Sequence, residues 1–199
     1  VSGRPLVALA DGTLIRWMIR GMDNDALEST LIARYTQFLD GFREKGRALA
    51  SYVSLPASTE IVNLLRFVGG DLAAAPPDLP TRAPDAPRLD GLLDRHVLAL
   101  ILGPGERSAV FGSASHIQAE YPTGTDIAFF YLRVPGPGGG ELGRVEVPRW
   151  VADDAALLDR VHATVLHECR KGEGYPLALS EAHERAVVRA SERGAFYRL

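Results

Sequence analysis

Residues 6–17 read LVALADGTLIRW, two apolar runs on either side of an Asp-Gly pair. The runs at 6–10 and 13–19 are rich in residues that favour β-strands, and Asp11-Gly12 suits the positive φ angles of a tight turn. The stretch therefore predicts two antiparallel strands in a β-hairpin, with the carboxylate of Asp11 at its tip.

The segment that follows predicts a helix, a strand and a second helix. Across 24–45, apolar residues recur at spacings of three and four, which is typical of a helix with one face on the core, and Gly46 ends it. Residues 48–53 predict a short buried strand, and Ser58 is a candidate N-cap for a helix over about 59–67. This strand-loop-helix unit is typical of an α/β protein.

The second half of the chain predicts further strands and then two helices. The pattern gives, in order, strands at 108–113, 127–134 and 143–151, the last two joined as a hairpin, and helices at 154–170 and 180–196. The whole order predicts an α/β fold in a single domain over 1–199, with a mixed β-sheet flanked by helices.

Two segments are less regular. Residues 97–102 are apolar throughout and fit either a buried strand or a buried helix. Residues 73–87 are rich in proline, which excludes a helix or a central strand and predicts an exposed excursion within the domain.

The overall composition limits the classes of function. The chain has 22 Lys and Arg against 25 Asp and Glu, and a net charge of -3 provides no global attraction to a polyanion, so any contact with nucleic acid has to be local. Cys169 is the single cysteine and cannot form an internal disulfide. The sequence shows neither an apolar stretch of transmembrane length nor a signal peptide, so we expect a cytoplasmic protein without a membrane partner.

Three residues near the two ends of the chain are candidates for chemistry. Asp11 lies where a strand delivers a carboxylate to the edge of a sheet, which can present an oxygen ligand to Mg²⁺ or Mn²⁺, although most Asp-Gly pairs between strands are turns only. His183 lies on or beside the inward stripe of the last predicted helix, and Tyr175 closes the glycine-rich loop before it. The ordinary structural roles of these two residues are a packed histidine and an aromatic lid over the core.

Basic residues offer local contacts for DNA. The loop GPGERS at 103–108 resembles an anion-binding loop to which Arg107 could add a bidentate contact, but it lacks the Lys and Ser/Thr of a P-loop. Arg66 and Arg149, the latter beside Trp150, are candidates for tracking a DNA backbone, a role that competes with simple solvation.

These pieces, in this order, resemble the NurA family of nucleases. The resemblance spans nearly the whole chain, and its most specific parts are the DGTL turn and the YPxxLxxAH pattern. The matching segments are LVALADGTLIRW (6–17), ASYVSLPASTEIVNLLR (50–66), GERSAVF (105–111), IAFFYLRV (127–134), RVEVPRWVA (144–152) and GYPLALSEAHERAV (174–187).

The resemblance implies a ribonuclease H-like fold and Mn²⁺-dependent cleavage of DNA, with Mg²⁺ as an alternative ion. It implies single-strand endonuclease and 5′ to 3′ exonuclease activities that process double-strand break ends in DNA repair, by a homodimer working with a HerA-type hexameric ATPase. By motif, Asp11 matches the family's second catalytic aspartate and is a metal ligand. His183 matches its metal-site histidine, and Tyr175 matches its active-site tyrosine.

The chain also departs from the family's pattern. An earlier aspartate, in an Asp-Gly-Ser strand, and a glutamate are both expected upstream of the DGTL turn, and neither is in this sequence, which begins at Val1 rather than at a methionine. We therefore expect an N-terminally truncated domain that is inactive alone. One alternative is a non-catalytic NurA-like scaffold or subunit that docks on the ATPase. Another is a different ribonuclease H-like enzyme, of the Argonaute or transposase type.

Overall fold

The computed structural model describes residues 6–16, 25–69, 91–121 and 123–186 of the chain. Three sequence predictions lie outside the described residues: the proline-rich excursion at 73–87, the end of the first predicted hairpin at 17–19, and the end of the last predicted helix at 187–196.

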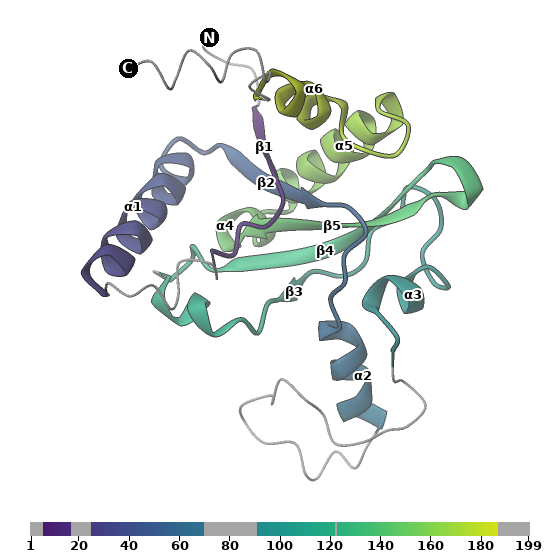
Figure 1. Ribbon diagram of the computed structural model, residues 1–199, viewed down its shortest axis with the longest axis horizontal. Coiled ribbons are helices and arrows are strands. Elements are labelled where there is room, and N and C mark those ends of the chain that lie inside the picture. Colours follow the sequence, from purple (N-terminus) through teal and green to yellow (C-terminus); the bar gives the residue numbers. More distant parts are fainter. Residues whose placement is uncertain (1–5, 17–24, 70–90, 122, 187–199) are drawn as a thin grey trace, which may run out of the picture.

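The described residues form one mixed β-sheet of five strands, in the order β1-β2-β5-β4-β3 (Figure 1). β1 and β2 run parallel, and the other neighbouring strands are antiparallel. The strands are β1 (Val7–Asp11), β2 (Ala48–Val53), β3 (Phe111–Gly112), β4 (Ile127–Val134) and β5 (Glu141–Pro148).

Helices cover both faces of this sheet. Residues of α4, α5 and α6 pack on one face, while α1, α2 and α3 contribute to two apolar clusters that include the side chains of the other face. The helices are α1 (Asp25–Arg43), α2 (Glu60–Gly69), α3 (Asp94–Leu98), α4 (Arg149–Ala152), α5 (Ala155–Lys171) and α6 (Leu177–Ala186), with short 3-10 turns at His116–Glu120 and Pro137–Gly139. None of the helices described is long and apolar enough to cross a membrane.

The predicted α/β class is confirmed, and the mixed sheet with flanking helices is consistent with a ribonuclease H-like fold. β2 and β4 have the predicted bounds, and α1 falls inside the predicted helix at 24–45. α5 also forms as predicted. The carboxylate of Asp154 caps its N-terminus by accepting the N–H groups of Ala156 and Leu157.

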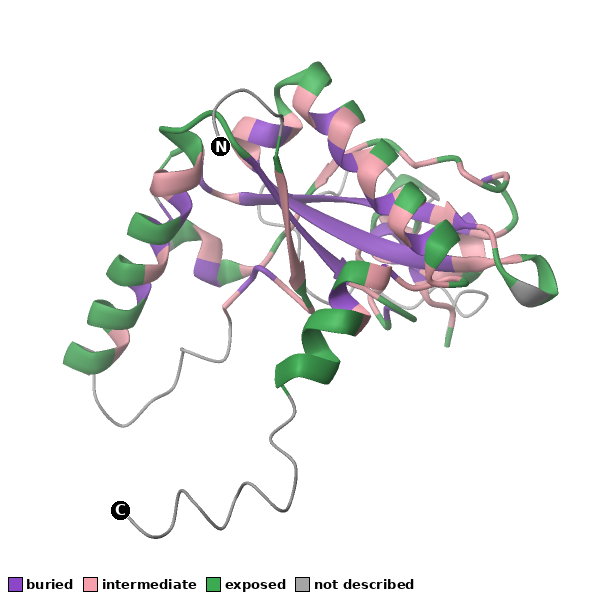
Figure 2. Ribbon diagram, turned by 90° about the horizontal axis from the view of Figure 1, so that it is seen from above, coloured by how far each residue is buried: buried purple, intermediate pink, exposed green. Residues whose placement is uncertain are grey.

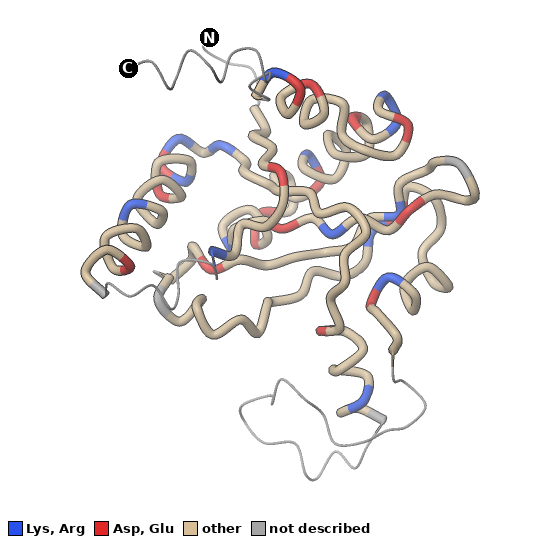
Figure 3. Tube along the Cα trace, in the orientation of Figure 1, with Lys and Arg blue, Asp and Glu red and all other residues tan. Residues whose placement is uncertain are grey.

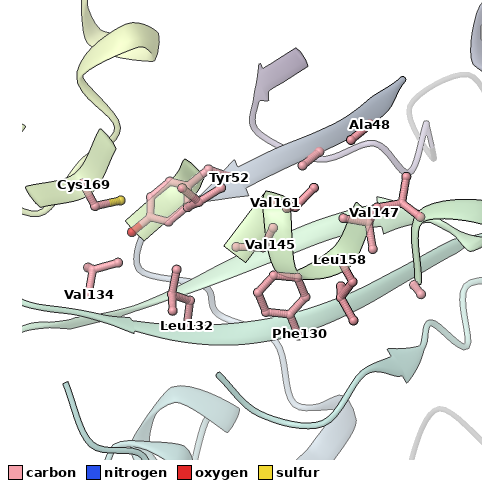
Figure 4. Packing of buried hydrophobic residues seen from close by; sticks show 14 of the residues in the cluster. Ala48, Tyr52, Phe130, Leu132, Val134, Val145, Val147, Leu158, Val161 and Cys169 are labelled. Atoms are coloured by element: carbon pink, nitrogen blue, oxygen red, sulfur yellow. The ribbon is translucent and has the colours of Figure 1, made fainter. Parts of the chain in front are cut away.

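The strands β2, β4 and β5 are buried along most of their length (Figure 2). Because side chains alternate along a strand, Val145 and Val147 of β5 enter the apolar cluster beneath α5, which Figure 4 shows around Phe130 and Val161. The alternation places Arg144 on the opposite face, where the core therefore has to accommodate charge.

The prediction of a β-hairpin over residues 6–19 is wrong in its second strand. β1 pairs with β2 in parallel, and residues 13–16 form no strand. After β1 the chain crosses to the other face of the sheet, where Leu14 is buried beside α1. Asp11 is therefore the last residue of β1, at its carboxyl end, and not the tip of a hairpin.

The predicted strand at 143–151 also needs correction at its end. β5 stops at Pro148, and the next residues turn into α4, so Trp150 is helical. The predicted strand at 108–113 is reduced to the two residues of β3. Residues 97–102, which fitted strand or helix, form the end of α3 and the turns after it.

Ser58 does not cap α2. The helix begins at Glu60, two residues after Ser58, and the Ser58 hydroxyl instead accepts a hydrogen bond from Arg144. The hydroxyl that the local sequence predicts as a helix cap is thus bonded to an arginine on β5, which is distant in the sequence.

Candidate active site

Asp11 ends β1, next to Tyr52 of the parallel strand β2. The N–H of Gly12 donates a hydrogen bond to the carbonyl of Tyr52 at 3.1 Å, just after the last paired residues of β1 and β2. Gly12 has a φ of +75°. By strand alternation Asp11 lies on the same face as Leu9, which packs in the cluster beneath α5 and α6. Its side chain is exposed. The carboxylate is therefore presented at the carboxyl end of a parallel strand pair, on the side of the sheet covered by α5 and α6.

Tyr175 reaches this carboxylate from the loop between α5 and α6. Its hydroxyl donates a hydrogen bond to Asp11 Oδ1 at 2.8 Å, which joins residues 164 positions apart. Burial, the hydrogen bond to Asp11 and the charge of that carboxylate raise the pKa of Tyr175 to about 12. The phenol therefore remains protonated, and so a donor, throughout the physiological range.

The loop that carries Tyr175 depends on Gly172. The N–H of Gly172 donates to the carbonyl of Glu168 and closes α5. A Cβ on this residue would lie 2.0 Å from the carbonyl oxygen of Tyr175, so a larger residue has no room. The tight turn at Gly172 therefore lets the chain run from the end of α5 directly to the carboxyl end of β1, where Tyr175 meets Asp11.

The ring of Tyr52 packs against the ring of Tyr175. The two rings meet edge to face, with centroids 5.6 Å apart and planes at 79°. Tyr52 is fully buried, and it fits only because Gly143 on β5 has no side chain, since a Cβ there would lie 2.3 Å from the ring. Burial raises the pKa of Tyr52 well above its usual value, so this supporting ring is uncharged.

His183 lies on α6, the helix that packs against β1. It follows the buried Leu179 by four residues and so belongs to the same helix face, but its own side chain is exposed. No hydrogen bond between His183 and either Asp11 or Tyr175 is found in the described residues. The fold therefore brings Asp11 and Tyr175 into contact and places the helix of His183 beside them.

A metal ion needs more ligands than this part of the chain supplies. An exposed carboxylate such as Asp11 is a suitable oxygen ligand for Mn²⁺ or Mg²⁺, and a nearby imidazole suits Mn²⁺. Within the described ranges, however, no three His, Cys, Asp or Glu side chains are grouped closely enough to hold an ion. The donors present fit part of a metal site and do not complete one.

The opposite face of the sheet holds a buried ionic network that the sequence patterns did not predict. Glu146 is 2% exposed, and its Oε2 accepts hydrogen bonds from the hydroxyl of Thr13 and the N–H of Leu14, both at 2.8 Å. Its Oε1 accepts from Arg144 Nε at 2.9 Å, and Arg144 also pairs with Glu60. The segment directly after Asp11 is thus tied to the middle of β5.

One signal in the sequence could have revealed this network. The predicted strand RVEVP alternates charged and apolar residues inside a region that has to be buried, so its charged residues needed partners. The sequence does not predict the partners of these charged residues, because Thr13 lies 133 positions away from Glu146.

The candidate DNA-binding arginines are engaged within the protein. Arg107 forms an ion pair with Asp159 at 2.7 Å, and Arg149 forms one with Asp126 at 2.8 Å. Arg66 contacts Asn63 of its own helix α2. In the described part of the chain, basic and acidic residues are interspersed over the helices and strands (Figure 3).

The 103–108 loop likewise uses its amides internally. The N–H of Gly103 donates to Glu106, and that of Gly105 donates to the carbonyl of Arg133 at 2.7 Å. The N–H of Ser108 donates to the carbonyl of Tyr131. These amides do not converge on an anion site, so the resemblance to an anion-binding loop has no geometric support.

The comparison with known proteins gives one family. A model of the NurA domain matches residues 2–188, a range that includes Asp11, Tyr175 and His183. No curated protein and no solved structure matches the chain at a significant level. The chain therefore belongs to the NurA family, a family of nucleases.

Proposed function

We propose that this protein is a metal-dependent DNA nuclease that cleaves single strands and resects 5′ ends during double-strand break repair. The hydrogen bond between Tyr175 and Asp11 carries the proposal, because it joins two family-motif residues from opposite ends of the chain. An exposed carboxylate held by a phenol is suited to divalent-ion chemistry on a phosphodiester.

In this proposal Asp11 is a metal ligand and His183 either completes the ligand shell or positions the attacking water. The hydroxyl of Tyr175 keeps its proton, so it can orient the Asp11 carboxylate or donate to a phosphate oxygen. A bound Mn²⁺ or Mg²⁺ would supply the polarisation of the phosphoryl oxygen and the lowered pKa of a bound water.

The proposal also includes the partners that the family resemblance implies. We expect a homodimer that receives DNA from a HerA-type hexameric ATPase in the cytoplasm. Because Arg107 and Arg149 are already paired with carboxylates, we expect DNA contacts to depend on local groups around Asp11 more than on these arginines.

The test is digestion of end-labelled single-stranded DNA by the protein translated from its full gene, with and without Mn²⁺. We expect Mn²⁺-dependent cleavage that Asp11→Asn abolishes and that Asp153→Asn, a change at an exposed carboxylate after α4, leaves intact. Full Mn²⁺-dependent cleavage by the Asp11→Asn protein would remove the assignment.

A non-catalytic NurA-like subunit is the second candidate. It is favoured by the absence, in the described part of the chain, of any three clustered metal-ligating side chains. It predicts that the full-length protein binds the ATPase ring but neither cleaves DNA nor binds Mn²⁺. The nuclease proposal predicts that the protein does cleave DNA and does bind Mn²⁺.

A further inference from the structure

A pocket with a volume of about 580 Å³ is lined in part by Gly174, the residue before Tyr175 of the candidate active site, and we call it the Leu55 pocket. Its walls come from the segment after β2, from α3, from the β4–β5 hairpin and from the loop before Tyr175, and they include Leu55, Arg95, His96, Glu141 and Glu173. Its volume is within the usual range for small-molecule sites.

Two chain connections link the pocket to Asp11. Gly174 lines the pocket, its carbonyl lies 3.4 Å from the Tyr52 hydroxyl, and the next residue, Tyr175, binds Asp11. On the other side, Leu55 follows Tyr52, the strand neighbour of Asp11, by only three residues. The pocket is therefore connected to Asp11 through the chain neighbours of Tyr52 and Tyr175.

Backbone strain is concentrated at this pocket. Among the described residues, the non-glycine residues with a left-handed backbone are Leu55, with a φ of 45°, and Glu173, with a φ of 54°, and both line the pocket. Such conformations are costly for residues with a Cβ and cluster at ligand-binding sites.

The strained conformation of Leu55 is held from both sides. Its N–H donates to Glu141 Oε1 at 3.3 Å, and its carbonyl accepts from Arg95 Nη1 at 2.8 Å. The result is an apolar side chain that is 63% exposed at the rim of the pocket.

The lining of the pocket also carries charged groups of both signs, Arg95 and Arg133 together with Glu141 and Glu173. Arg95 and Arg133 donate to backbone carbonyls, and neither forms an ion pair within the described ranges. His96 Nδ1 accepts the N–H of Leu93, which leaves Nε2 as the ring nitrogen that can donate to a ligand. Apolar Leu142 and Ala99 complete the lining.

We propose that the Leu55 pocket binds one unpaired nucleotide of the DNA strand whose backbone passes Asp11. Leu55 covers the face of the base, and the N–H groups of Arg95, Arg133 and His96 that are not used within the protein donate to its phosphate. A base in a duplex has its faces and its edge occupied, so entry requires a single strand or a flipped nucleotide. The inference rests on the proposed nuclease function and adds to it a structural source of single-strand preference.

The test is fluorescence anisotropy with two labelled 15-mers, oligo-dT and an abasic strand of the same backbone, in EDTA and low salt so that no cleavage occurs. The full-gene protein is compared with Leu55→Ala and His96→Ala. The matched controls are Leu100→Ala, at a leucine that is 89% exposed outside the pocket, and His116→Ala, at another exposed histidine. Thermal unfolding confirms folding, and Leu55→Gly, which tolerates a positive φ, replaces Leu55→Ala if that variant is unstable.

We expect oligo-dT to bind about tenfold more tightly than the abasic strand, and Leu55→Ala to remove most of that difference. His96→Ala should weaken both strands, and the two controls should match the wild type. Equal binding of both strands by the wild type, or oligo-dT binding unchanged in Leu55→Ala and His96→Ala, would overturn the pocket proposal. Cleavage by Asp11→Asn is measured separately, so failure of the nuclease proposal is told apart from failure of the pocket.

Discussion

Thr13 and Glu146, 133 positions apart, are joined by a 2.8 Å hydrogen bond that ties the exit of β1 to the centre of β5. The N–H of Leu14 donates to the same oxygen of Glu146, and Arg144 donates to the other oxygen of that carboxylate. Asp11 lies two residues before Thr13. Its position therefore depends on a network that lies on the opposite face of the sheet.

Glu146→Gln should strongly destabilise the fold. The change leaves Arg144, which is only 5% exposed, without one of its charged partners, and breaking a buried pair in this way costs about 3 kcal/mol or more. Urea unfolding measures the free energy of unfolding. Glu184→Gln, at an exposed glutamate on α6, serves as the control and should shift it by less than about 0.5 kcal/mol. A Glu146→Gln protein as stable as that control would show that the network contributes nothing to stability.

Gly172→Ala should disturb the Tyr175 loop. The added Cβ would lie 2.0 Å from the Tyr175 carbonyl oxygen, so the loop has to move, and we expect a loss of about 1–3 kcal/mol of stability. The matched control is Gly41→Ala in α1, where a Cβ meets nothing within 4 Å and helix propensity should raise stability by up to about 1 kcal/mol. Thermal melts compare the two, and equal melting temperatures would contradict the close approach.

Tyr175 should titrate late and give a stability change at high pH. Its pKa is raised from 10.0 to about 12, by burial first and then by Asp11, so the protonated phenol is favoured in the folded state. This stabilisation is fully present below pH 10 and is lost as the pH rises toward 12. Ultraviolet titration of tyrosinate formation should lose one late-titrating group in Tyr175→Phe. Loss of a group that titrates near pH 10 instead would contradict both the burial of the phenol and its hydrogen bond to Asp11.

The elements that sequence predicted well are those that local patterning determines. β2 and β4 are mostly apolar and buried, and α5 has a clear helical pattern, so local patterning sufficed for all three. The family motifs single out Asp11 and Tyr175, whose roles in catalysis stay a prediction, and the structure shows that the two side chains meet where β1 and the α5–α6 loop come together.

The errors arose where distant partners decide local structure. Residues 13–16 have the pattern of a strand, but the buried carboxylate of Glu146 and the apolar cluster beside α1 take their hydrogen bonds and side chains. Ser58 has the chemistry of an N-cap, yet Arg144 uses its hydroxyl. In the same way, the ion pair of Arg107 with Asp159 depends on how α5 packs and could not be read from the 103–108 loop.

The most direct test of the central claim is the Mn²⁺ affinity of the full-gene protein, measured by isothermal titration calorimetry for the wild type, Asp11→Asn and His183→Ala, with Glu184→Gln as the control on the same helix. If Asp11 and His183 share one ion, each of these two changes should weaken Mn²⁺ binding by at least about tenfold, while the control binds like the wild type. Wild-type Mn²⁺ affinity in both Asp11→Asn and His183→Ala would contradict the shared site.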